Sequence, residues 1–288
     1  MRVRRIAILI DGGFFIKRLS KLVAPEHRDS AAAVARSAGI LCRNHVRRLI
    51  GEKGDARNSR WLDHVYRLFY YDATPYEGIA HHPLLNVQIQ FGKTPEAAFR
   101  NELFSALRRQ RKFALRLGKV TKEDGWHITD AAITKRLLGT RDWVHLLDAA
   151  AGHAAGGPAA PLTQADLARL KNLADAWRNL KPEDVRLTLR QKGVDMRIGI
   201  DITTLTLKKQ VDTIILVTGD SDFVPAAKVA RREGVEFLLD PLWQQINDDL
   251  HEHVDGVVSG FPRPGTTASP SDDSDEPAEG DAPLLPPS

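Results

Sequence analysis

The stretch TIILVTGDSDFV, residues 213–224, decides the fold class of this chain. Its first five residues form a short continuous apolar run, which is typical of a strand buried on both faces of a parallel sheet. Thr218, Gly219 and Asp220 then end the strand, and a helical pattern follows through Val224 and Ala227. A strand, a tight turn and a helix in this order predict an α/β fold.

Other segments of the chain repeat this pattern or extend it. The first strand is expected to end at Asp11-Gly12-Gly13, and a helical pattern follows it. Residues 114–120 and 126–129 fit two strands of a hairpin around Glu123-Asp124-Gly125. Strands are also expected at 6–10, 65–71 and 235–239, and helices at 95–112 and from an N-cap at Thr163 to about 180. This alternation predicts a mainly parallel sheet with right-handed crossovers.

Composition limits the class of protein. The chain has 288 residues, of which 42% are hydrophobic and 27% charged, an ordinary globular balance. A single cysteine, Cys42, excludes an internal disulfide and a cysteine-cluster zinc site, and it favours a cytoplasmic protein. No run of ~18 apolar residues is present, so we expect no membrane span.

Charge is distributed unevenly along the chain. One basic and six acidic residues follow Pro262, so residues 1–262 carry 40 basic and 31 acidic side chains. We expect residues 1–258 to form one domain with insertions at about 20–60 and 120–180, and residues 259–288 to be a disordered acidic tail rich in Pro and Ser. Residues 149–161 are nearly all Ala, Gly and Pro and indicate a flexible loop. A basic domain attracts polyanions, although solubility alone explains the charge equally well.

Acidic residues follow two of the predicted strands. Asp11 ends the first, and Asp220 and Asp222 follow the strand at 213–217. One such Asp is explained as a helix cap, but the carboxyl ends of parallel strands are also where open α/β sheets place their active sites.

An upstream segment, residues 192–202, adds two more carboxylates, Asp195 and Asp201. Its apolar residues alternate as in a strand, and they also fit a helical stripe. On a strand the two carboxylates would share a face, whereas on a helix only one of them would reach the mouth of the sheet. Asp72, in Asp-Ala-Thr-Pro after residues 65–71, is favoured as a turn residue.

Several carboxylates in one place repel each other and stay ionised together only beside cations. Oxygen donors without paired Cys or His suit Mg²⁺ or Mn²⁺ and disfavour zinc, and two such ions can support phosphodiester cleavage. Phosphate contacts are expected from Lys192 and Thr218 near the strand ends and from the densest basic run, which holds Arg100, Arg108, Arg109, Arg111, Lys112, Arg116 and Lys119. Within this run the main candidates are Arg108, Arg109, Arg111 and Lys112.

At these residues the sequence resembles the NYN domain family, a branch of the PIN-like ribonucleases, and its bacterial LabA-like members in particular. The resemblance rests on ILIDGGF (8–14), YYDATP (70–75), KGVD (192–195) with Asp201, and LVTGDSDFVP (216–225). Phe14 stands where the family commonly has Asn, and Ser221 where it often has Gly.

The resemblance implies a PIN-like three-layer α/β/α sandwich and metal-dependent cleavage of RNA. Carried over by position, the acidic site comprises Asp11, Asp195, Asp220 and Asp222 as catalytic residues, with Asp201 as a further metal ligand. The expected protein is therefore a Mg²⁺- or Mn²⁺-dependent endoribonuclease. A NYN module that binds RNA or a regulatory partner without cutting, and a phosphatase for small phosphoesters, are the alternatives. DNA is not excluded as the substrate, and a homodimer is left open.

Overall fold

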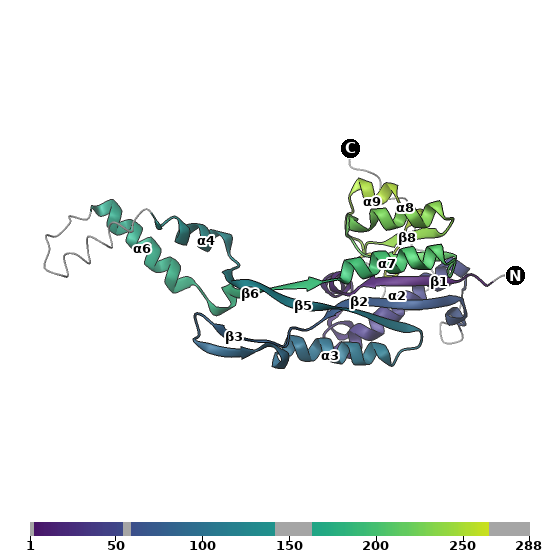
Figure 1. Ribbon diagram of the computed structural model, residues 1–288, viewed down its shortest axis with the longest axis horizontal. Coiled ribbons are helices and arrows are strands. Elements are labelled where there is room, and N and C mark those ends of the chain that lie inside the picture. The colour runs from purple at the N-terminus through teal and green to yellow at the C-terminus, as the bar shows by residue number, and fades with distance from the viewer. Residues whose placement is uncertain (1–2, 54–58, 142–162, 265–288) are drawn as a thin grey trace. The chain divides into compact units, whose positions relative to one another are not determined.

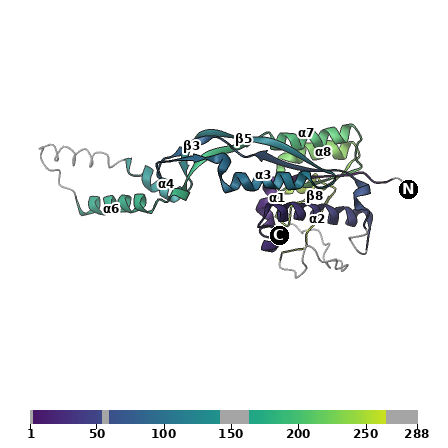
Figure 2. The same cartoon turned by 90° about the horizontal axis from the view of Figure 1, so that it is seen from below.

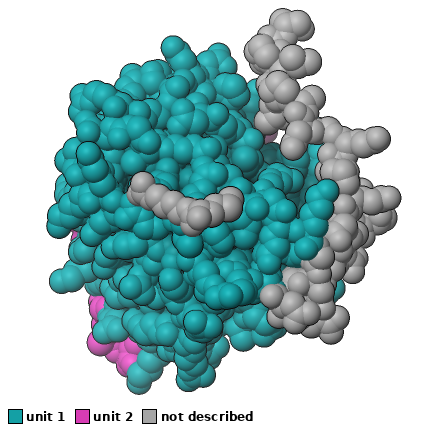
Figure 3. Space-filling view, turned by 90° about the vertical axis from the view of Figure 1, so that its right-hand side faces the viewer, with its two compact units in different colours: residues 1–77, 91–121, 191–288 teal, residues 78–90, 122–190 magenta. Residues whose placement is uncertain are grey.

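The computed structural model describes residues 3–53, 59–141 and 163–264. The described chain divides into two compact units (Figure 3). Unit 1 lies within residues 1–77, 91–121 and 191–288, and unit 2 within residues 78–90 and 122–190. The loop expected at 149–161 and residues 265–288 of the expected tail lie outside the described residues.

A seven-stranded sheet forms the centre of the fold (Figure 1), in the order β6-β5-β2-β1-β7-β8-β9. The pairings β1–β2, β2–β5, β1–β7, β7–β8 and β8–β9 are all parallel. The strands are β1 Ile6–Asp11, β2 Val65–Thr74, β5 Phe113–Ile128, β6 Val185–Lys192, β7 Thr213–Val217, β8 Glu236–Asp240 and β9 Gly256–Val257. The chain builds the sheet outward from β1 through β2 on one side and through β7 on the other, so β1 is its topological switch point.

Helices cover both faces of the sheet in unit 1. In Figure 2, α1 (Gly12–Leu19) and α2 (Ala31–Ile50) lie on one side and α7 (Val194–Leu207) and α8 (Val224–Arg232) on the other. The alternation of β1 explains this, because Ile6, Ile8 and Ile10 join the core with α1, α2 and α3 (Pro95–Arg108), whereas Ala7 and Leu9 join the core with α7 and α8. The predicted α/β fold, consistent with a PIN-like sandwich, is confirmed. Beyond these helices unit 1 holds only the short α9 (Asp248–Glu252) among its described α-helices.

Unit 2 holds a small antiparallel hairpin of β3 (Ile79–His82) and β4 (Val87–Gln90) and two helices. The helices are α4 (Ala131–Leu138) and α6 (Gln164–Asn179). Thr163 caps α6 as predicted, since its side chain accepts a hydrogen bond from the Asp166 amide at 3.2 Å.

Two local expectations differ from the structure, and one alternative that the sequence left open is decided by it. The hairpin expected within 114–129 is wrong: β5 runs unbroken from Phe113 to Ile128, because pairing with neighbouring strands keeps its polar second half extended. The segment 192–202 is helical, and Gly193, at φ 78°, makes the left-handed turn between β6 and α7. The chain also stays packed beyond Ser259, since Gly260 is buried and Phe261 stacks on Phe15 at 6.5 Å.

The residues expected as an insertion at 20–60 include α2, whose buried face contributes Val34, Ala38, Leu41 and Val46 to the core beneath the sheet. Asp240 ties α2 to the end of β8. His45 of α2 lies 2.7 Å from Asp240 through Nε2, and the amides of Leu242 and Gly260 donate to the same carboxylate. All of these groups are buried, so the carboxyl end of β8 is firmly held.

Candidate functional site

Asp11 and Thr218 meet at the carboxyl ends of β1 and β7, the two strands at the topological switch point of the sheet. Ile10 pairs with Val217 in the parallel register, so the next residue of each strand reaches the same edge. The Thr218 hydroxyl donates to Asp11 Oδ2 at 3.4 Å. The expectation that the two strand ends share an edge is met by this contact, and this is the place where open α/β folds bind ligands.

Asp11 caps α1 and also faces other carboxylates. Its Oδ1 accepts a hydrogen bond from the Phe14 amide at 3.1 Å, so the cap interpretation of this residue holds. Burial is the largest cause that raises the Asp11 pKa; the Phe14 amide lowers it, and the charges of Asp195 and Asp72 raise it further. Asp11 therefore caps α1 and also lies within electrostatic reach of Asp195 and Asp72.

Glycines bring the backbone close together around Asp11. A Cβ on Gly12 would lie 2.5 Å from Tyr70 Cε1 and 2.6 Å from the Tyr71 carbonyl oxygen, so only glycine fits there. A Cβ on Gly219 would lie 2.9 Å from the Phe14 ring and 2.8 Å from Gln244 Nε2. Phe14, which replaces the family's common Asn, thus packs over the turn that leads to Asp220.

Asp195, Asp220 and Asp222 follow the ends of β6 and β7 and form the second group of acidic residues near the carboxyl edge. Asp220 accepts a hydrogen bond from the Asp222 amide at 3.0 Å, and the Asp220 amide donates to Thr218 Oγ1 at 3.3 Å. Asp195 stands in the first turn of α7. Partial burial is the main cause that raises the Asp195 pKa, and the charges of Asp220 and Asp222 raise it further. Asp195 thus lies within electrostatic reach of Asp11 on one side and of Asp220 and Asp222 on the other.

Asp201 lies in a different environment from Asp195. Its Oδ2 accepts hydrogen bonds from the Tyr71 hydroxyl at 2.8 Å and from Arg116 Nε at 2.9 Å. The carboxylates that raise the Asp11 pKa are Asp195 and Asp72, and those that raise the Asp195 pKa are Asp220 and Asp222. Asp201 is not one of them. Because α7 is a helix, six residues separate the two side chains by ~9 Å along the axis and by about 120° around it. Asp201 therefore forms an ion pair with Arg116 and lies apart from the other carboxylates.

The sequence reasoning considered Asp72 and Arg100 separately and missed that they form a pair. Asp72 is buried, forms an ion pair with Arg100 Nη1 and accepts from its neighbour, the Ala73 amide, at 2.8 Å. Burial is the largest cause that raises the Asp72 pKa, and the Arg100 charge counters it. The position of Asp72 after a buried strand, like that of Asp11, was the available signal; nothing in the sequence indicated that Arg100 would reach it.

The predicted phosphate contacts fall on two edges of the sheet. Lys192 ends β6 next to α7, and Thr218 contacts Asp11. The basic run Arg108, Arg109, Arg111 and Lys112 precedes β5, and Lys112 Nζ donates to the carbonyl of Val65, the first residue of β2. This run therefore lies at the amino edge, and the structure does not bring it together with Asp11.

Donor chemistry at the carboxyl edge fits a hard divalent cation. Within residues 3–53, 59–141 and 163–264, no three His, Cys, Asp or Glu side chains are placed to hold a metal ion. Mg²⁺ nevertheless usually keeps several waters and binds through one or two carboxylates together with substrate phosphates. Burial is the largest cause that raises the pKa of both Asp11 and Asp195, and a bound cation would relieve the smaller contribution that neighbouring carboxylates make to each. The carboxylate oxygens of these residues are the donor type that Mg²⁺ and Mn²⁺ prefer.

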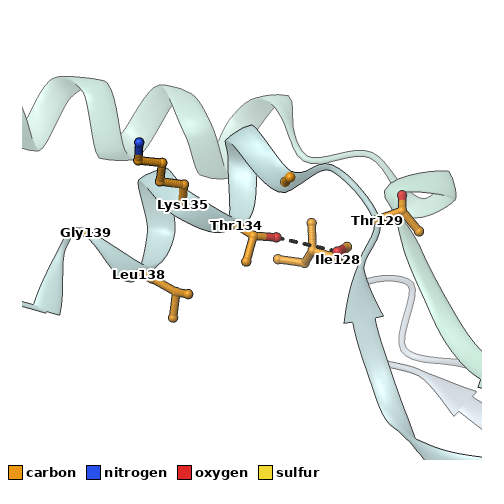
Figure 4. A pocket seen from close by; sticks show the side chains of 7 residues that line it. Ile128, Thr129, Thr134, Lys135, Leu138 and Gly139 are labelled. Atoms are coloured by element: carbon orange, nitrogen blue, oxygen red, sulfur yellow. Dashed lines mark hydrogen bonds between the residues drawn. The ribbon is translucent and has the colours of Figure 1, made fainter.

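A groove in unit 2 offers a contrast to this acidic edge (Figure 4). It is lined by Ile128, Thr129, Ala131, Thr134, Lys135, Leu138 and Gly139, and none of these residues is acidic. Its chemistry does not suit a divalent cation, so the carboxyl edge of unit 1 remains the candidate site.

Comparison with known proteins supports the family. The NYN domain family matches residues 162–259, which include Asp195, Asp220 and Asp222. The expected NYN resemblance is therefore confirmed over these residues, while the LabA-like branch stays a prediction. No curated protein matches the chain.

One solved structure is similar at low identity. It is the crystal structure of a protein of unknown function, VPA0982, from Vibrio parahaemolyticus RIMD 2210633, with 12% identity and a TM-score of 0.36 over 91% of this chain and 99% of the other.

Among the described residues, no helix combines the length and the apolar character needed to cross a bilayer.

Proposed function

We propose that this chain, whose residues 162–259 match the NYN domain, is a cytosolic Mg²⁺- or Mn²⁺-dependent endoribonuclease. NYN domains belong to the PIN-like nucleases, a family that suggests a nucleic-acid substrate and typically uses divalent metals. The observation that supports the proposal is that the ends of β1 and β7 meet at the switch point of the sheet, where Thr218 contacts Asp11, with Asp195 within electrostatic reach of Asp11 and of Asp220 and Asp222.

Each residue has a role that follows from its position. One or two of Asp11, Asp195 and Asp220 would hold the ion together with waters and a substrate phosphate, and Asp222 would assist at the exposed side. Asp201, already paired with Arg116, is the weaker candidate. When bound, a divalent ion would neutralise these carboxylates, lower the pKa of a water and polarise the phosphodiester. Thr218 orients Asp11 through its hydroxyl. Lys192 ends β6 three residues before Asp195 and would contact the RNA backbone from there.

Two measurements on the full chain test the proposal. Cleavage of unstructured and hairpin RNA, and of DNA of the same sequence, is followed in Mn²⁺ and in chelator. Manganese uptake is followed separately by calorimetry. We expect Asp220→Asn to abolish cleavage and to weaken manganese uptake. Asp63→Asn removes the same charge from a residue just before β2, at the amino edge, and serves as the matched control.

The outcomes separate the alternatives. Cleavage that survives Asp220→Asn at the wild-type rate refutes the proposed site. RNA binding that persists in chelator without any product in Mn²⁺ favours a binding module. Hydrolysis of an aryl phosphate with RNA left intact favours a phosphatase.

A further inference from the structure

Arg100 of α3 reaches the carboxyl end of β2 and is held there by two carboxylates. Its Nη1 pairs with the buried Asp72, and its Nε lies 2.9 Å from Glu96 Oε1, one helical turn earlier. Two contacts on different nitrogens fix the plane of a guanidinium group. Arg100 is therefore an oriented cation.

The guanidinium keeps part of its donor capacity. Arg has five N–H donors, and the hydrogen bonds of Arg100 to described residues use only Nε and Nη1. The side chain is 19% exposed, whereas the Asp72 side chain is 0% exposed. Nη2 is thus available to a group that arrives from solvent.

Contacts connect this cation to the acidic edge. Gln191 Nε2 donates to Asp72 Oδ1 at 3.4 Å, and Gln191 lies four residues before Asp195. On the other side, the Tyr70 hydroxyl donates to the carbonyl of Gly12, the residue after Asp11, at 3.5 Å. Tyr70 also lies within electrostatic reach of Arg100, Asp72 and Asp11. Arg100 therefore pairs with Asp72, which itself lies within electrostatic reach of Asp11.

We propose that Arg100, oriented by Asp72 and Glu96, contacts a backbone phosphate of the RNA strand next to the carboxylate site. This inference rests on the proposed function and names the residue that receives the strand. An anionic strand is repelled by the carboxylates that surround Asp11, so a fixed cation beside them favours the approach of a phosphate. A guanidinium suits this task because its planar fork matches phosphate oxygens.

The simpler alternative is that Arg100 only neutralises Asp72. Arg100→Gln alone does not separate the two roles, because it leaves a buried carboxylate unpaired and destabilises the fold. The double variant Asp72→Asn/Arg100→Gln removes both charges and should regain the thermal stability that Arg100→Gln loses. If neutralisation were the whole role, the double variant would also regain RNA binding.

The experiment uses the full chain and a labelled single-stranded 12-nucleotide RNA. Binding is measured by fluorescence anisotropy in chelator, where cleavage is prevented, at several KCl concentrations. Loss of one phosphate contact should reduce the slope of log Kd against log salt by about 0.7 and weaken binding about tenfold at low salt. Arg232→Gln removes the same charge from the exposed end of α8 and is the matched control.

Each outcome decides. The proposal is supported if the double variant keeps a wild-type melting temperature but shows the weaker binding and the smaller slope, while Arg232→Gln binds like the wild type. It is overturned if the double variant binds RNA with wild-type affinity and slope. If the wild-type chain shows no salt-dependent RNA binding in chelator, this inference fails, and the proposed function fails with it only if RNA cleavage in Mn²⁺ is absent as well. If the wild type binds and only the Arg100 effect is missing, the inference alone fails.

Discussion

Gly12 and Gly13 follow Asp11 directly and differ in the space around them, which makes them a test of how the site is positioned. A Cβ on Gly12 would lie 2.5 Å from Tyr70 Cε1 and 2.6 Å from the Tyr71 carbonyl oxygen. A Cβ on Gly13 would meet only Asp11 Oδ1, at 3.5 Å. Both glycines stand in the first turn of α1, so the same substitution to alanine gives opposite results.

The magnitude follows from the overlap at Gly12. An ordinary contact begins at 3.4 Å, so α1 and β2 must part by 0.8 to 0.9 Å to admit the new methyl group. Overpacking of this kind costs about 1–3 kcal/mol, which lowers the melting temperature of a chain of this size by about 2–12 °C. Gly13→Ala meets no clash and gains about 0.5–1 kcal/mol from the restricted unfolded chain.

The displacement also moves Asp11, which sits at the junction of β1 and α1. A shift of about 1 Å in a catalytic group can cost ~100-fold in rate. We therefore expect Gly12→Ala to lose most of its Mn²⁺-dependent RNA cleavage, and Gly13→Ala to retain it. Calorimetry and a cleavage assay on both variants check this. Equal melting temperatures and equal rates for the two variants would refute the packing argument.

Two further predictions concern charges at the carboxyl edge. Burial and the charges of Asp195 and Asp72 raise the Asp11 pKa, so this carboxyl favours folding below its unfolded pKa and loses that contribution as pH rises through its raised folded pKa. Asp11→Asn should thus melt at a higher temperature than the wild type at pH 7.5 in chelator, and the difference in melting temperature should shrink toward pH 3.8. Calorimetry across this pH range measures both; a lower melting temperature for the variant at pH 7.5 would contradict the prediction. His45→Ala leaves the buried Asp240 carboxylate without its imidazole partner, and should cost about 3–5 kcal/mol in urea unfolding; a loss below about 1 kcal/mol would show that the pair is not a main support of the edge.

Buried strands were predictable because their sequences allow one interpretation. The apolar runs of β1, β7 and β8 predicted these strands to within a residue, since both faces of each strand contact a core. The segment 192–202 was ambiguous because its apolar residues fit both periods. Tertiary packing decides it: Ile198 and Ile202 reach the core on one helical face, while Met196 and Ile200 are exposed.

The site was predictable where its residues follow a strand, and not where they arrive from another element. Asp11 and Asp220 could be placed because Asp11 ends β1 and Asp220 lies three residues after the end of β7, and the parallel sheet fixes the direction of both strands. The pair of Asp72 and Arg100 depends on where α3 packs, and 28 residues separate the two in sequence. No local pattern carries that information.

The same logic explains why the densest basic run is not at the acidic edge. Sequence counting gathers Arg108, Arg109, Arg111 and Lys112 because they are neighbours, but they come before β5, whereas Asp11 comes after most of β1. Phe113 pairs with Leu68, which pairs with Ile8, so the start of β5 lies level with a residue three positions before Asp11. Those three residues are ~10 Å of strand. A cation can reach the carboxylates only from the carboxyl ends of the strands or from a helix beside them. For this reason the single oriented Arg100 on α3 is a stronger candidate for contact with RNA near Asp11 than the four basic residues within 108–112.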